Sequence, residues 1–143
     1  MVGHVILRVL VKWLIPFILM FALYVQFHGD FGPGGGFQAG VIFGAGIILY
    51  ALIFGLPAAR RVYPARMLEL LTALGVLIYG GVGVFTMALG GNFLDYDVLA
   101  HDPHAGQHLG ILLVELGVGV TVAAVMVTLF MHFAGRGSVP PDQ

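Results

Sequence analysis

The sequence predicts an all-α integral membrane protein with four transmembrane helices and both termini in the cytoplasm. Of the 143 residues, 59% are hydrophobic and 9% are charged, whereas a soluble domain carries roughly 25% charged residues. Four apolar stretches have about the 20 residues needed to cross a ~30 Å hydrocarbon core. All lysines and arginines lie in segments that four successive spans would place on the same side of the membrane. A single membrane domain, 1–143, is therefore expected, with helices at about 5–27, 37–56, 67–89 and 109–133 and a short C-terminal tail at 134–143.

The first predicted helix, 5–27, carries two charges near its start and contains one proline. It spans the membrane fully only if the side chains of Arg8 and Lys12 extend to the interface, as long basic side chains do. Pro16 lies near the start of the uncharged part, 13–27, where a missing backbone donor is expected to cost less than in mid-helix. We therefore expect a complete helix here.

The other three predicted helices are continuous apolar runs. The second contains no charge, the third contains Glu69 and the fourth contains Glu115. Runs of this length without alternation are not typical of strands. Small residues recur at helical spacing in all three, and such residues let helices approach closely. We expect these faces to serve both packing within the chain and docking onto other subunits.

The orientation follows from the basic residues. Cytoplasmic loops of membrane proteins are enriched in lysine and arginine, and here the two connections at 28–36 and 91–108 contain neither. These two connections are therefore expected to face outward, and the 57–66 connection inward with both termini. The basic residues on the predicted inner side are Arg8, Lys12, Arg60, Arg61, Arg66 and Arg136.

Several classes of function are disfavoured by composition. The formal net charge of -1 gives no electrostatic case for nucleic acid. The chain has no cysteine, which excludes disulfides, thiolate nucleophiles and cysteine-ligated metals. We find no nucleophile–base pattern, no zinc motif and no cofactor motif. A transport role is thus favoured over a membrane enzyme.

A glycine-rich turn precedes the second predicted helix. It reads H-G-D-F-G-P-G-G-G-F-Q-A-G from His28 onward, which matches neither a phosphate loop nor a dinucleotide fingerprint. The glycines Gly34, Gly35 and Gly36 allow unusual φ values and close backbone approach. Two interpretations stay open: a tight turn with Asp30 near the positive end of the helix dipole, or crowding against a neighbour. Glycines also recur within the second predicted helix, where Gly36, Gly40 and Gly44 have four-residue spacing and so share one face.

The same segment carries a family resemblance. The run P-G-G-G-F-Q-A-G, which starts at Pro33 and includes Gln38, enters a predicted helix and is preceded by His28. In this motif, and in length, helix number and the acidic loop before the fourth helix, the chain resembles the B subunit of the multisubunit Mrp-type sodium/proton antiporters, the MnhB-like family. It differs from the family pattern at Asp30, where histidine or asparagine is common, and at Ala39, where a second glycine is common.

The resemblance implies a small, required subunit of a cation/proton antiporter in the bacterial inner membrane. It also implies partners: other hydrophobic subunits, including large ones related to respiratory complex I that hold most of the ion-translocating helices, with sodium and protons as the transported ions. The alternative from the residues alone is a self-contained homo-oligomeric channel or small cation transporter.

Glu115 is the most informative single residue. Counted from His108, it lies about 10 Å below the outer surface at 1.5 Å per residue. A carboxylate in the membrane costs ~2.5–3.5 kcal/mol at the bilayer centre and less at this depth. Two interpretations follow: a proton or cation relay site, or a polar anchor for another subunit.

Four further residues are weaker relay candidates. Glu69 lies in the first turn of the third helix, where the helix dipole and a local ion pair with Arg66 offer a structural explanation. Lys12 is explained by interfacial snorkelling. His28 and Asp30 lie on the predicted outer side and could form part of a proton-entry surface.

The outer loop before the fourth helix is rich in histidine and aspartate. Its histidines, at spacings of three and four, share one face only if the segment is helical, and Pro103 within the set favours a loop. A polar outer cap is therefore preferred over a metal site. The residues are Asp95, Asp97, His101, Asp102, His104 and His108.

Overall fold

The computed structural model describes residues 2–29 and 34–136, and these are mainly helical. Four of the helices are long and apolar enough to cross a membrane, which confirms the predicted all-α fold with four spans. The elements are α1 (Val2–His28), α2 (Gly36–Phe54), α3 (Leu56–Val62), α4 (Ala65–Ala88), the 3-10 helix η1 (Tyr96–Leu99) and α5 (Pro103–Arg136).

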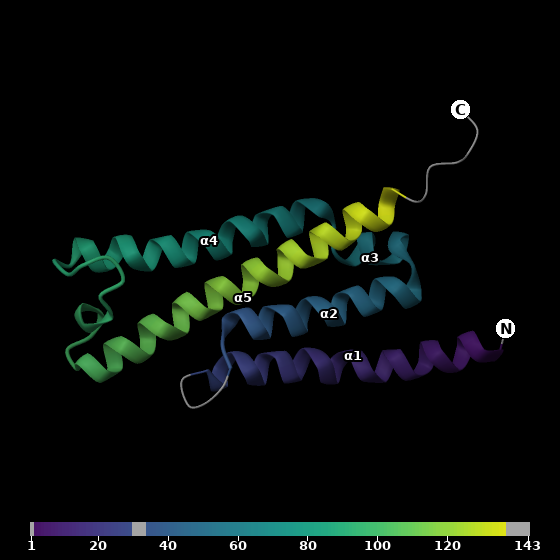
Figure 1. Cartoon of the computed structure of the whole chain (residues 1–143), viewed down its shortest axis with the longest axis horizontal. Helices are drawn as coiled ribbons and strands as arrows, with labels where there is room; N and C mark the ends of the chain where they lie inside the picture. Colours follow the sequence, from purple (N-terminus) through teal and green to yellow (C-terminus); the bar gives the residue numbers. More distant parts are fainter. Residues whose placement is uncertain (1, 30–33, 137–143) are drawn as a thin grey trace.

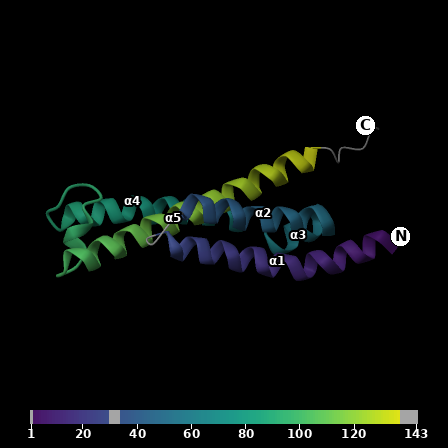
Figure 2. The ribbon, with the colours of Figure 1, turned by 60° about the horizontal axis from the view of Figure 1, so that its bottom comes forward.

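The long helix α5 organises the bundle. Figure 1 shows it running diagonally between α4 on one side and the α1–α2 pair on the other, and α5 packs on both α2 and α4. α1 packs mainly on α2, as the turned view in Figure 2 also shows. The start of α1 and the end of α5 lie at one end of the bundle, and the end of α1 and start of α2 face the other. This arrangement fits the predicted topology, while the side of the membrane stays a prediction.

The second span ends earlier than predicted, and its connection to the third is helical. α2 stops at Phe54 because Gly55 adopts φ +92°, a left-handed conformation that favours glycine. Pro57 then lies in the first turn of α3, where a missing N–H costs little. Ala59 of α3 is fully buried against the bundle. The connection between the second and third spans is therefore a short helix that packs on the end of the bundle.

The fourth span begins at Pro103, six residues before the predicted start at 109. The prediction that Pro103 keeps this segment in a loop was wrong, because proline suits the first position of a helix. The carboxylate of Asp102 accepts a hydrogen bond from the backbone N–H of His104 at 3.2 Å, which caps the helix start. At 1.5 Å per residue the 34 residues of α5 measure about 51 Å, so the helix must tilt or project from a ~30 Å core.

Glycines form the helix contacts within the chain. A Cβ on Gly40 of α2 would lie 2.6 Å from the carbonyl oxygen of Gly119 on α5. Likewise, a Cβ on Gly75 of α4 would lie 2.6 Å from the carbonyl oxygen of Gly117. Real Cβ contacts are not this short, so α5 approaches both neighbours only because these residues are glycine. A small apolar cluster completes the packing towards the end that holds the termini: Ile47, Ala51, Ala59, Leu68, Val127 and Met131.

Candidate ion site at the glycine turn

The turn between α1 and α2 packs directly on Glu115 of α5. A Cβ on Gly29 would lie 2.6 Å from Glu115 Oε2, and a Cβ on Gly35 would lie 3.2 Å from Oε1. A Cβ on Gly36 would collide with the backbone carbonyl oxygen of Glu115. The carboxylate thus occupies the space that side chains on the turn would fill, and the crowding predicted for the turn occurs within this chain.

The other predicted glycines, Gly34 and Gly44, and Gln38 have different surroundings. A Cβ on Gly34 would lie 3.1 Å from the carbonyl oxygen of Val25, and one on Gly44 would be in ordinary contact at 3.5 Å from Met126. Gln38 is exposed on α2 and does not point into the junction. Asp30 and Pro33, the other predicted turn residues, lie outside the described residues.

Gln26 is a second polar group at this junction. It precedes Gly29 by three residues on α1, and its Oε1 would lie 2.5 Å from a Cβ on Gly119, which follows Glu115 by four residues on α5. The contact between α1 and α5 therefore consists of two residue pairs about one helical turn apart. Gly29 contacts Glu115, and Gln26 contacts Gly119. Gln26 is 5% exposed, and its Nε2 has no hydrogen-bond partner among the described residues.

A buried amide donor without a partner costs roughly 1–3 kcal/mol. Water is the usual partner for such a group when the surroundings are polar and have enough space. Gln26 was missed in the sequence analysis, although one signal was present. It is the only side-chain amide in the run 13–27, which is otherwise almost entirely apolar.

The imidazole of His28 lies at the outer end of this junction. It is half-buried in the last turn of α1, beside Gly29, and stacks on Tyr24 with ring centroids 5.2 Å apart. Glu115 is also half-buried. The structure thus groups Glu115, Gln26 and His28 around the glycine turn, which we call the glycine-turn junction.

Lys12 belongs to the opposite end of the bundle. Its Nζ lies 5.9 Å from the ring centroid of Phe54, the last residue of α2, whereas Glu115 contacts Gly36, the first. The 18 residue-to-residue steps from Gly36 to Phe54 correspond to about 27 Å. Lys12 therefore does not join the glycine-turn junction.

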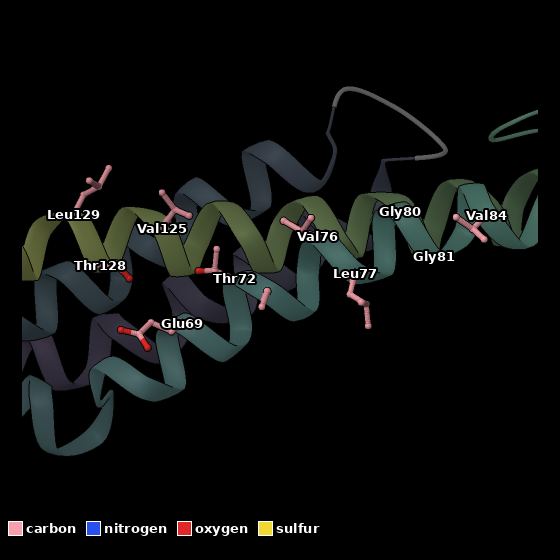
Figure 3. Close-up of a pocket in the computed structure, with 11 residues that line it drawn as sticks. Glu69, Thr72, Val76, Leu77, Gly80, Gly81, Val84, Val125, Thr128 and Leu129 are labelled. Atoms are coloured by element: carbon pink, nitrogen blue, oxygen red, sulfur yellow. The ribbon is translucent and has the colours of Figure 1, made fainter.

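Glu69 lies in a groove between α4 and α5, shown in Figure 3. The groove has a volume of about 960 Å³ and is lined mainly by apolar side chains. Thr72 and Thr128 lie beside Glu69, which is exposed. The expected local ion pair is not formed: among the described residues, Glu69 has no salt bridge to Arg66 or to another cation.

Two aspartates of the segment before the fourth span make local hydrogen bonds. Gln107 Nε2 donates a hydrogen bond of 2.7 Å to Asp97 Oδ1, and Asp102 caps α5. His104 and His108 are exposed on α5. Across the described residues, we find no group of three or more histidine, aspartate or glutamate side chains that could hold a metal ion.

Four apolar helices, and a carboxylate enclosed by a glycine turn, define a multi-pass membrane protein with an acid built into its helix contacts. Residues 6–128 match the family model described as a domain related to the MnhB subunit of Na+/H+ antiporters. The chain belongs to this MnhB family.

Curated relatives agree with the family model over nearly the whole chain. Proteins named as candidate antiporter subunits mnhB2 from Staphylococcus aureus strains Newman, COL and bovine RF122 are each 34% identical over 139 residues. The aligned region covers 95% of this chain and 98% of each relative. The family resemblance in the sequence is confirmed.

Proposed function

We propose that this chain is a small accessory subunit of a multisubunit sodium/proton antiporter, and that Glu115 relays a proton or cation near the outer side of the membrane. Membership of the MnhB family over residues 6–128 supports the first part. The observation that carries the second part is the close contact of the Glu115 carboxylate with the turn at Gly29 and Gly35.

The direction of the carboxylate favours a relay over an anchor. An anchor for another subunit would present its oxygens on the outer surface of the bundle. Here both oxygens of Glu115 lie against the chain's own turn, with Oε2 facing Gly29 and Oε1 facing Gly35. Because both positions are glycine, no side chain separates the carboxylate from the turn, and its oxygens lie close to the turn's backbone.

The chemistry of the neighbouring groups fits a relay. A carboxyl group accepts and releases protons, and its oxygens also suit hard cations. The buried amide of Gln26 is one helical turn deeper and can hold a water molecule against the same contact. His28 lies in the last turn of α1, beside the turn, and its ring nitrogens can donate or accept a proton.

The proposed role depends on partners. Transporters usually need two halves that move around a central site, and we find no repeat in the sequence that supplies them. We infer that large hydrophobic subunits related to those of respiratory complex I provide the main ion path, in the bacterial inner membrane. The self-contained channel is disfavoured because the curated relatives of matching length are named as antiporter subunits.

The test is Glu115→Gln in the complete antiporter, with Glu69→Gln as the matched control. The amide keeps the shape and much of the hydrogen bonding but does not titrate. We expect the Glu115 variant to assemble at normal yield and to lose most sodium-dependent proton movement in vesicles, or to show an altered pH profile. The control should retain the wild-type pH profile in the complexes that form.

Two outcomes would contradict the proposal. Normal exchange by the Glu115 variant across the pH range would remove the relay. Failure of the variant to assemble, with normal exchange per assembled complex, would favour the anchor. Reconstitution of the purified chain alone should give no cation-coupled proton movement, and robust flux would favour the self-contained transporter instead.

A further inference from the structure

The groove between α4 and α5 has one polar end and one open glycine face. Its polar end holds Glu69, Thr72 and Thr128, and its other lining side chains are apolar. In Figure 3 the oxygens of these three side chains lie at the gap between the α4 and α5 ribbons. Further along α4, Cβ atoms on Gly80 and Gly81 would meet nothing within 4 Å. Both Cβ positions therefore face open space.

The polar end presents hydrogen-bond acceptors only. The hydroxyl of Thr72 donates to the carbonyl oxygen of Leu68 at 2.9 Å, and the hydroxyl of Thr128 donates to that of Ala124 at 2.7 Å. Both hydroxyl hydrogens are therefore committed to their own helices, and only lone pairs are left for the groove. An ionised Glu69 adds acceptors and a negative charge. A group that complements this set is a donor with a positive charge.

The nearby cations of the chain do not supply that charge. Arg60 and His132 line a separate cavity of about 320 Å³ that Glu69 also borders. The imidazole Nδ1 of His132 hydrogen bonds to the carbonyl oxygen of Thr128 at 2.8 Å, and the guanidinium of Arg60 lies against Gly135. Among the described residues neither forms a salt bridge with Glu69. Among the described residues, no cation therefore satisfies Glu69, and a partner can supply the complementary charge.

We propose that this groove binds a transmembrane helix of another antiporter subunit, one that places a lysine or arginine against Glu69. The open backbone at Gly80 and Gly81 lets a helix approach closely. Helices carry their basic residues preferentially at the cytoplasmic end, where the predicted topology also puts Glu69. Lipid acyl chains would leave the acceptor set without a donor. The proposal rests on the chain being a subunit and does not depend on a relay through Glu115.

The first experiment compares substitutions inside and outside the groove in the complete complex. Gly81→Leu fills the groove, whereas Ala88→Leu adds the same side chain at an exposed position at the end of α4. Glu69→Lys reverses the charge. We expect Gly81→Leu and Glu69→Lys to lower the yield of purified complex about tenfold, equivalent to roughly 1.4 kcal/mol, with Ala88→Leu unchanged. Wild-type yields for both groove variants would overturn the proposal.

A second experiment does not depend on how the variants fold. A photo-crosslinking amino acid at Leu77, which lines the groove, should attach the chain to one other subunit. The same probe at Leu74, exposed one turn earlier and outside the groove lining, should not attach to that subunit. Crosslinks from Leu77 to lipid alone would overturn the proposal. Lower sodium affinity in the Glu69→Gln complex, at unchanged yield, would also overturn it by making the occupant a free ion.

Discussion

The glycine-turn junction and the α4–α5 groove place two acids of the spans in opposite surroundings. At the junction, Gly29 and Gly35 lie so close to Glu115 that its carboxylate occupies the space of their absent side chains. In the groove, Glu69 is exposed, and Gly80 faces open space. Glycine thus closes one surface and leaves the other open. The role of a glycine in a membrane helix therefore depends on what a Cβ at that position would meet.

The largest effect expected from this comparison is that of Gly36→Ala. The added Cβ collides with the backbone of Glu115, so α2 and α5 must separate. Overpacking of this kind costs about 1–3 kcal/mol, and backbone yields less readily than a side chain. We expect a lower melting temperature and a lower yield of the purified subunit, measured by thermal stability in detergent.

Gly80→Ala is the matched control for that substitution. It adds the same methyl group at a helical glycine where nothing lies within 4 Å. Alanine favours a helix over glycine by ~1 kcal/mol, so the isolated subunit should be as stable as wild type or more stable. If the two variants melt alike, the contrast between the junction and the groove is wrong.

A smaller effect should come from Gln26→Leu. Leucine removes the buried amide but has a similar volume, so the subunit should assemble normally. If Gln26 holds water beside Glu115, exchange in vesicles should fall roughly tenfold, the factor for one hydrogen bond of ~1.4 kcal/mol. Gln26→Glu keeps a polar group and should retain exchange with an altered pH profile. Normal exchange by Gln26→Leu would show that Gln26 takes no part in the relay, which would then involve only Glu115 and the turn.

Gly44→Ala should change almost nothing in either region. The added Cβ would lie 3.5 Å from the Cβ of Met126, an ordinary van der Waals distance. The expected shift in thermal stability is close to zero, with up to ~1 kcal/mol of stabilisation from helix propensity. A loss as large as that for Gly36→Ala would show that these Cβ distances do not rank the effects of substituting the glycines.

The sequence predicted the spans well because long apolar runs have one stable solution in lipid. It predicted the acid and the glycine turn as separate features, yet not their contact, since the path of α5 decides which turn meets Glu115. The burial of Gln26 depends on Gly119 of α5, so no local pattern could reveal it. Pro103 was misread because proline both ends and begins helices. The groove follows from which face of α4 the diagonal α5 leaves uncovered.

Single cysteines can show which side of the membrane each of the two acids faces, and they should not change activity. The chain contains no cysteine, so single cysteines report without background. Ala100→Cys, next to η1, should react with an impermeant thiol reagent in intact cells. Ala58→Cys, on α3, should react only after the membrane is opened. This pattern places the glycine-turn junction towards the outside and Glu69 towards the cytoplasm.

The opposite labelling would reverse both roles. Glu115 would then lie nearer the cytoplasm, and the positive-inside bias would no longer favour a lysine or arginine beside Glu69. The contacts around both acids would be unchanged, because they depend on the packing of the chain and not on its orientation. Labelling therefore tests the direction of the proposed relay and the identity of the groove's partner residue separately from the fold.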